Sequence, residues 1–443
     1  MNTEHAGSRV WKSLANDYGM IFVLLLMVVV LSALTLEEQS PVGREAGKRV
    51  ADEIISRLGT EVTVVIVAEA TPVDEAFVQG ASERLQAAGL AIAAEVSGRP
   101  VDARRTMEEV LSDGGRIDAV AATADTVRWT IYDRFEGLST DRCFSPESYT
   151  WPTFARLDNL LSVANQTAIY AIIAIGMTMV IITAGIDLSV GSLVALASVT
   201  AALIIRDSGG REAGVGGMLA GCLAGVAVCA VAGLFNGLMN TRFGIPPFIA
   251  TLAMMMVARG LARRLSGELS IQQLPDSYLW IGGGTTLGIP NPVILMILLY
   301  GIAHVVMSMT VFGRYVYSVG GNAEAARLSG VPVKTVTLVV YTLCGALAGL
   351  GGIVQSSKLG SGDPKLGLMF ELDVIAAAVV GGTSLMGGEG RIFGTLIGAF
   401  IIAVIKNGMN LMNVGAPDQQ IVLGGVVLVA VLVDTLKRRG AKS

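Results

Sequence analysis

The chain has 443 residues, of which 52% are hydrophobic and only 15% are charged. This composition is too apolar for an ordinary soluble protein of this length, so it excludes a simple soluble enzyme and places the chain in a bilayer. Half of the charged residues lie between 37 and 157, where 21 acidic and 13 basic side chains give a net charge of −8. This segment is therefore a separate hydrophilic region, and the overall pI, which averages two unlike parts, says little about partners.

The N-terminal apolar run Met20–Leu34 follows Arg9 and Lys12. An apolar run behind basic residues is also the pattern of a secretory signal peptide. Here the run extends to about Val10–Leu36, and no small-residue cleavage site follows it. We interpret residues 1–36 as a cytoplasmic N-terminus and a retained first transmembrane helix.

The hydrophilic segment 37–157 alternates between helical and β-branched stretches. Helices are expected at Ala46–Leu58, Val73–Ala88 and Val101–Ser112, and strands at Val62–Val67, Leu90–Val96 and Ile117–Ala122. Such alternation is typical of βαβ units on a parallel sheet, so we predict an inserted α/β domain. The order, clearest in TVVIVAEATPVDEAFVQGASERLQAAG, resembles part of one lobe of a periplasmic sugar-binding protein. About 120 residues cannot supply two lobes, so we favour a docking or stabilising domain and keep ligand binding as the alternative.

The remaining chain, 158–436, contains repeated apolar runs long enough to cross about 30 Å of hydrocarbon. With the N-terminal run they make ten candidate spans, and an even number places both termini on the same side of the membrane. Lys and Arg in the short loops identify that side as the cytoplasm and place the 37–157 insertion outside it. The nine runs are Leu160–Thr183, Leu188–Ile205, Gly217–Met239, Pro246–Leu261, Pro292–Met309, Val336–Val354, Leu372–Leu385, Phe393–Met412 and Ile421–Leu436. Residues 437–443 form a basic cytoplasmic tail.

Cysteine and histidine usage predicts no metal site. The four cysteines, at 143, 222, 229 and 344, lack metal-like spacing, and only Cys143 lies in the hydrophilic segment. The two histidines, His5 and His304, are too few for a histidine-based site, and His304 lies in an apolar run where helix packing is the simpler role.

One acid interrupts the apolar sequence at Gly176-Met-Thr-Met-Val-Ile-Ile-Thr-Ala-Gly-Ile-Asp187-Leu-Ser189-Val-Gly-Ser192. An ionised Asp at membrane depth costs about 2.5 to 3.5 kcal/mol on insertion scales, so Asp187 should face protein, water or an interface. Gly185 precedes it, and Asp is a good N-cap. We therefore predict that Asp187 caps the following helix, with a direct contact to solute as a second role.

The stretch AGIDLSVGS resembles the signature of ABC permeases of the ribose, xylose and arabinose type. Further stretches agree in order from about 159 to 436, including Pro247-Phe-Ile-Ala-Thr-Leu, Phe312-Gly-Arg-Tyr-Val-Tyr, Glu371-Leu-Asp-Val-Ile-Ala-Ala-Ala and Gly381-Gly-Thr-Ser-Leu-Met-Gly-Gly-Glu-Gly-Arg. The resemblance implies an all-α polytopic permease of about ten transmembrane helices in the bacterial inner membrane, which imports a monosaccharide or related polyhydroxyl solute by alternating access. Permeases of this type have a short link in place of the 37–157 insertion.

The longest polar break on the predicted cytoplasmic side, 312–335, is expected to contain a short helix after Asn322. The resemblance implies that this segment couples the permease to an ATPase subunit through Gly321, Asn322, Ala325, Ala326, Arg327, Ser329 and Gly330. A simple solvated loop is the alternative. No G-x-x-x-x-G-K-[ST] sequence is present, so the chain is expected to bind no cofactor itself and to leave ATP and Mg²⁺ to that partner.

Polar residues inside the apolar runs are the candidates for the solute path, because a neutral polyhydroxyl solute needs amides and hydroxyls rather than fixed charge. Taken singly, each is more often an interhelical hydrogen bond. The candidates are Asn165, Gln166, Asp187, Ser189, Asn236, Thr251, Asn407 and Gln420. Lys406 is expected to reach the surface or to pair with an acid across a dimer.

The expected partners are an ABC ATPase subunit, a second, identical permease subunit, an extracytoplasmic solute-binding protein and membrane lipid, with no nucleic acid. The contrasting hypothesis is a membrane receptor whose insertion binds a ligand and signals through the helical bundle. The absence of a kinase, cyclase or methyl-accepting tail after Lys437 argues against the receptor.

Overall fold

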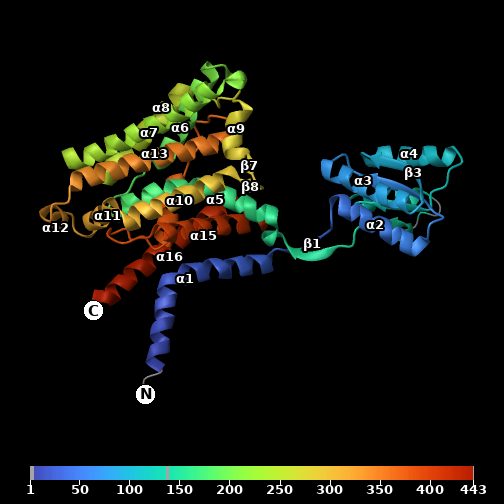
Figure 1. The fold of residues 1–443 in the computed structure, drawn as a ribbon, viewed down its shortest axis with the longest axis horizontal. Helices are drawn as coiled ribbons and strands as arrows, with labels where there is room; N and C mark the ends of the chain where they lie inside the picture. Colours follow the sequence, from blue (N-terminus) through green and yellow to red (C-terminus); the bar gives the residue numbers. More distant parts are fainter. Residues whose placement is uncertain (1–3, 136–137, 139, 443) are drawn as a thin grey trace. The chain divides into compact units, whose positions relative to one another are not determined.

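The structure, a computed structural model, describes residues 4–135, 138 and 140–442 and divides into two compact units. Unit 1 comprises Met1–Thr35 and Thr153–Ser443, and unit 2 comprises Leu36–Pro152. Figure 1 shows the helices of unit 1 and the small α/β fold of unit 2. Each unit is described by itself.

Unit 2 contains a four-stranded sheet in the order β3-β2-β4-β5, with every neighbouring pair parallel. This confirms the predicted βαβ arrangement. The strands are β2 (Thr63–Ala68), β3 (Ala91–Ser97), β4 (Ala119–Ala122) and β5 (Cys143–Phe144), and the helices are α2 (Gly43–Leu58), α3 (Pro72–Ala87) and α4 (Pro100–Ser112).

Strand β2 lies at the centre of this sheet and is buried on both faces. Val64 and Ile66 pack in one cluster with residues of α2 and α3, whereas Val65 and Val67 pack in a second cluster with residues of α4. Side chains alternate between the faces of a strand, and a parallel strand with helices on both sides therefore needs apolar residues at every position. The unbroken β-branched run Val62–Val67 is explained by this double burial.

The two segments through which the chain enters and leaves unit 2 pair as a two-stranded antiparallel ribbon. Strand β1 (Leu36–Gln39) pairs with β6 (Tyr149–Pro152), so that Leu36 lies opposite Pro152. Three short 3₁₀ helices precede β6 in the chain: η1 (Thr126–Arg128), η2 (Tyr132–Arg134) and η3 (Thr140–Arg142).

Unit 1 is a bundle of long helices with shorter helices between them. The long helices are α1 (Glu4–Leu34), α5 (Leu157–Ile182), α6 (Val190–Asp207), α7 (Val215–Phe243), α8 (Pro247–Ser266), α10 (Asn291–Met309), α13 (Val333–Leu359), α15 (Ile392–Leu411) and α16 (Ala416–Lys442). The shorter elements are η4 (Thr153–Ala155), η5 (Gly210–Glu212), α9 (Asp276–Gly283), the β7–β8 hairpin (Thr285–Thr286 and Ile289–Pro290), α11 (Val311–Gly321), α12 (Ala323–Leu328) and α14 (Phe370–Val380).

Six helices within the described residues are long and apolar enough to cross a membrane: α5, α6, α7, α10, α13 and α15. The apolar stretches Gly19–Leu34 and Ala416–Leu432 are shorter, and α8 carries three arginines. Helix α14 has 11 residues, or about 16 Å of rise, which is half of what a crossing requires. The prediction of a continuous span at Leu372–Leu385 is therefore wrong, because the helix ends at Val380 and a turn follows at Gly381 and Gly382.

Glycines allow the helices to pack with their backbones in close contact. A Cβ atom on Gly233 of α7 would lie 2.2 Å from the Tyr341 carbonyl oxygen of α13, and one on Gly345 would lie 2.3 Å from the Cys229 carbonyl oxygen. Gly221 and Gly225 approach α6 in the same way. Small residues at these positions therefore let the helices approach closely.

Candidate functional site

The signature around Asp187 forms a buried polar cluster at the break between α5 and α6. The Asp187 side chain is fully buried, and its Oδ1 accepts hydrogen bonds from the Ser189 backbone N–H at 2.9 Å and from the Ser189 hydroxyl at 2.5 Å. Ser189, not Asp187, is the N-cap residue of α6. The predicted cap is corrected accordingly: Asp187 holds the turn that leads into the helix.

Two further predicted residues join this cluster from neighbouring helices. The amide of Asn236 on α7 donates to the Ser189 hydroxyl at 3.1 Å, and the Thr251 hydroxyl on α8 donates to the Ile186 carbonyl at 3.3 Å. All four residues of the cluster are at most 1% exposed. In this conformation the cluster therefore joins α6, α7 and α8 and is closed to solute.

The other four predicted path residues lie elsewhere. Asn407 on α15 exchanges two hydrogen bonds with Asn159 on α5, at 2.8 and 3.1 Å, and so connects two helices. Asn165 has a buried Oδ1 without a partner among the described residues. Gln166 and Gln420 have exposed side chains that line a cavity of about 710 Å³ between α5, α14, α15 and α16. The sequence prediction thus combined residues from several separate regions of the bundle.

The same cavity contains an ion pair that the sequence analysis missed. Lys406 Nζ lies 2.6 Å from Asp373 Oδ2 and 5.1 Å from the centre of the Tyr170 ring. The expectation that Lys406 reaches the surface or pairs across a dimer is wrong, because its partner lies in the same chain on α14. Residues 33 positions apart on different helices carry no local spacing signal. Only the unusual presence of an acid and a base inside apolar runs marked them.

The predicted short helix after Asn322 is present as α12. Asn322 is its N-cap, and its Oδ1 accepts hydrogen bonds from the backbone N–H groups of Glu324 at 3.1 Å and Ala325 at 3.0 Å. Gly330 ends the segment with a φ of 82°, a conformation that glycine adopts at little cost. The sequence fixes both ends of this helix locally.

The exposed face of α12 carries charge and one apolar side chain. Arg327 and Glu324 form an ion pair, whose hydrogen bond lowers the pKa of Glu324 below its ordinary value. Leu328 is 75% exposed, whereas Ala326 is buried. Gly321, Ala325 and Ser329 are also exposed. This face therefore offers both an apolar and a charged side chain for contact with another protein.

The chain leading into α12 packs directly against the end of α5. A Cβ atom on Gly320 would lie 1.7 Å from the Ile182 carbonyl oxygen, which also accepts a 2.8 Å hydrogen bond from the Gly388 backbone N–H. The Tyr317 hydroxyl donates to the Gly390 carbonyl at 2.8 Å. Displacement of α12 would therefore press on the break between α5 and α6 that holds the Asp187 cluster.

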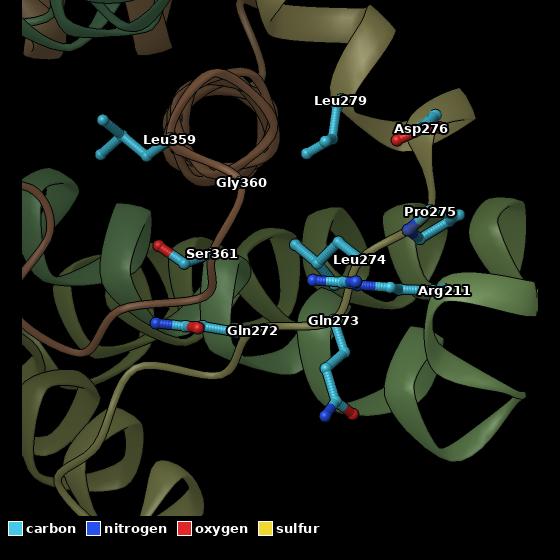
Figure 2. Close-up of a pocket in the computed structure, with 10 residues that line it drawn as sticks. All are labelled: Arg211, Gln272, Gln273, Leu274, Pro275, Asp276, Leu279, Leu359, Gly360 and Ser361. Carbon is cyan, nitrogen blue, oxygen red and sulfur yellow. The ribbon is translucent and has the colours of Figure 1, made fainter.

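A polar pocket lies at the end of α13 remote from α12, and Figure 2 shows its lining side chains. Its volume is about 480 Å³, and Gln272, Gln273 and Arg211 contribute polar groups. Helix α13 has 27 residues, or about 40 Å of length. The pocket and α12 therefore lie at opposite ends of the bundle. Within the described residues, no group of three or more His, Cys, Asp or Glu side chains is arranged to hold a metal ion.

Comparisons with known proteins agree on the class of this bundle. Residues 159–432 match the family model described as "Branched-chain amino acid transport system / permease component". The ribose import permease protein of Escherichia coli K12 is 43% identical over 65% of this chain and 88% of its own length, and that of Bacillus subtilis 168 is 45% identical over 65% and 87%. The L-arabinose ABC transporter permease protein of Azospirillum brasilense is 37% identical over 67% and 85%.

No solved structure matches the chain significantly. The family match covers more than half of the chain, and it spans both the Asp187 cluster and the α12 segment but none of unit 2. The chain therefore belongs to this family of membrane permease components of ABC importers.

Proposed function

We propose that this chain is the permease subunit of an ATP-driven importer that moves a monosaccharide across the inner membrane of a bacterium by alternating access. The observation that carries the proposal is the match of residues 159–432, together with three sugar permeases at 37 to 45% identity. The family description names branched-chain amino acids, but these relatives carry the names of ribose and arabinose. We follow the relatives for the class of solute.

A separate ATPase subunit supplies the energy in this proposal and binds ATP and Mg²⁺, since the chain contains no phosphate-binding loop of its own. Helix α12 with its flanking residues Gly321, Asn322, Ser329 and Gly330 docks on that subunit. Its movement reaches the spans through the contact of Gly320 with the Ile182 carbonyl. Two copies of the chain form the transport unit.

Topology follows from this docking. With α12 at the cytoplasmic face, both termini are cytoplasmic, and the polar pocket of Figure 2 opens on the outer side. There it serves as part of the platform for a solute-binding protein. Unit 2 also lies on the outer side of the membrane in this proposal.

The test is transport by a purified importer. The chain is reconstituted in proteoliposomes with its ATPase and its solute-binding protein, and uptake of labelled ribose, arabinose, allose and leucine is measured with and without ATP. We expect ATP-dependent uptake of at least one sugar and none of leucine. Leucine uptake in the absence of sugar uptake would overturn the assignment of solute, and failure of the chain to bind an ATPase would overturn the assignment of mechanism.

A further inference from the structure

The cavity between α5, α14, α15 and α16 contains charged groups that the family assignment leaves without a role. Its volume of about 710 Å³ lies within the range of roughly 300 to 1,000 Å³ that is usual for small-molecule sites. Two of its lining residues, Gln166 and Gln420, are exposed amides on different helices. The cavity therefore combines the size and the polar groups of a ligand site.

The ion pair in this cavity can both donate and accept hydrogen bonds. Lys406 and Asp373 lie 2.6 Å apart, with side chains only 19% and 16% exposed. An ammonium has three N–H donors, and a carboxylate has two acceptor oxygens, so this one contact leaves donors on Lys406 and the Oδ1 of Asp373 available. Because the two charges neutralise each other, the pair offers hydrogen bonds of both senses without a net charge.

The walls of the cavity are apolar and partly aromatic. The rings of Tyr170 and Phe370, both of which line it, lie 4.6 Å apart at an angle of 53°. Leu423 and Val427 of α16 add aliphatic surface. An apolar wall with a few converging polar groups matches a small molecule that has hydroxyl groups on its edge and C–H groups on its faces.

We propose that this cavity binds the transported solute, a neutral monosaccharide, and that Lys406 and Asp373 bind its hydroxyl groups. The inference rests on the proposed function. A neutral polyhydroxyl ligand can use the remaining Lys406 donors and the Oδ1 of Asp373 together, and it brings no charge to a pair whose own two charges cancel. A lipid acyl chain would cover the aliphatic wall and leave the charged pair unused.

Two adjacent glycines on α16 supply a matched test. Gly424 lines the cavity and Gly425 does not, and a Cβ atom added at either position meets no atom within 4 Å. Gly424→Leu therefore fills the cavity without a backbone clash, and Gly425→Leu adds the same side chain outside it. In the reconstituted importer we expect Gly424→Leu to raise the KM for ribose uptake at least tenfold and Gly425→Leu to leave it within about twofold. A leucine in the cavity displaces the sugar from at least one hydrogen bond to the charged pair, and one such bond corresponds to about tenfold or more.

A second pair of variants tests the polar groups if Gly424→Leu does not fold. Gln166→Ala removes an exposed amide from the cavity, and exchange of the pair as Lys406→Asp with Asp373→Lys preserves the ion pair but moves the ammonium to α14. Both variants are expected to raise the KM for ribose while the melting temperature of the detergent-solubilised chain stays unchanged. An unchanged KM in the exchanged variant would show that the pair is purely structural and would overturn the proposal.

The results of these experiments distinguish the proposed solute site from the proposed function of the importer. A wild-type importer that moves ribose, whose KM is unchanged by Gly424→Leu, would overturn the solute site and leave the importer assignment intact. A wild-type importer that moves no sugar would overturn the proposed function and, with it, this site. A third result is that leucine competes with ribose for uptake in the wild type and in Gly425→Leu but not in Gly424→Leu. This result would identify the cavity as an amino acid site and overturn the choice of a neutral ligand.

Discussion

Two polar regions of the bundle, the Asp187 cluster and the cavity at Lys406, use similar residue types in opposite ways. The cluster is closed, and each of its four members has at least one hydrogen bond within the protein. The cavity is open, and its amides Gln166 and Gln420 are exposed. Burial of a polar group in a bundle fixes helices in place, whereas exposure to a cavity leaves the group available to a ligand.

Substitution of Asp187 by Ala is expected to have the largest effect on stability. It removes the acceptor of two hydrogen bonds from Ser189, which leaves buried donors unpaired at a cost of about 1 to 3 kcal/mol each, and it leaves the turn into α6 unsupported. Thermal unfolding can be followed with a thiol-reactive dye, because Cys229 and Cys344 are buried. Asp187→Asn, which keeps one acceptor oxygen, is the control. An unchanged melting temperature for Asp187→Ala would show that the cluster does not hold the helices.

Asn407→Ala is expected to cost less, about 1 to 2 kcal/mol, because two neutral amide hydrogen bonds with Asn159 are lost. The double variant with Asn159→Ala should add only the loss of the 2.8 Å hydrogen bond from Asn159 to the Phe154 carbonyl, about 1 kcal/mol, since either single change already breaks both bonds between the two amides. The same dye assay measures all three variants. If Asn407→Ala instead raised the KM for sugar at an unchanged melting temperature, Asn407 would belong with the open cavity, as the sequence first indicated.

Asn322→Ala removes the N-cap of α12, which is worth about 1 kcal/mol locally. We expect the global melting temperature to stay unchanged, because α12 is a short exposed helix, and sugar-stimulated ATP hydrolysis by the partner to fall. Asn322→Ser restores a capping side chain and should recover the activity. If the sugar stimulated ATP hydrolysis fully in Asn322→Ala, the capped form of α12 would not be required for coupling to the ATPase.

The smallest expected effect concerns pH. The hydrogen bond from Arg327 lowers the pKa of Glu324, so the pair's contribution is complete above the ordinary value of about 4.5 and is lost only as the pH falls through the lowered pKa. Uptake between pH 6 and 8 should therefore be independent of Glu324. Glu324→Gln should change uptake at pH 7 by less than about twofold, as is usual for an exposed pair. A pH profile that shifts in this variant would show that the pair is buried against the partner.

The sequence predicted elements well where a local signal existed. The parallel strands of unit 2 follow from β-branched runs between amphipathic helices, and α12 follows from Asn322 at its start and Gly330 after its end. Prediction failed at α14, where the apolar composition suggested a span to Leu385 but the helix ends at Val380, before the glycine pair Gly381-Gly382. It also failed for Lys406 and Asp373, because helix packing, not sequence spacing, brings them together.

The ribbon of β1 and β6 bears on how unit 2 came to interrupt a permease. Thr35 and Thr153 are 118 positions apart in the sequence, yet the Thr153 backbone N–H donates to the Thr35 carbonyl at 2.8 Å, and the Phe154 backbone N–H donates to the Thr35 hydroxyl at 3.1 Å. The chain thus leaves α1 and returns towards α5 at almost the same point. A foreign coding segment could enter a gene at such a point without changing the spacing of the flanking helices, and the ancestral permease would keep its packing while acquiring a new appendage on which selection could act.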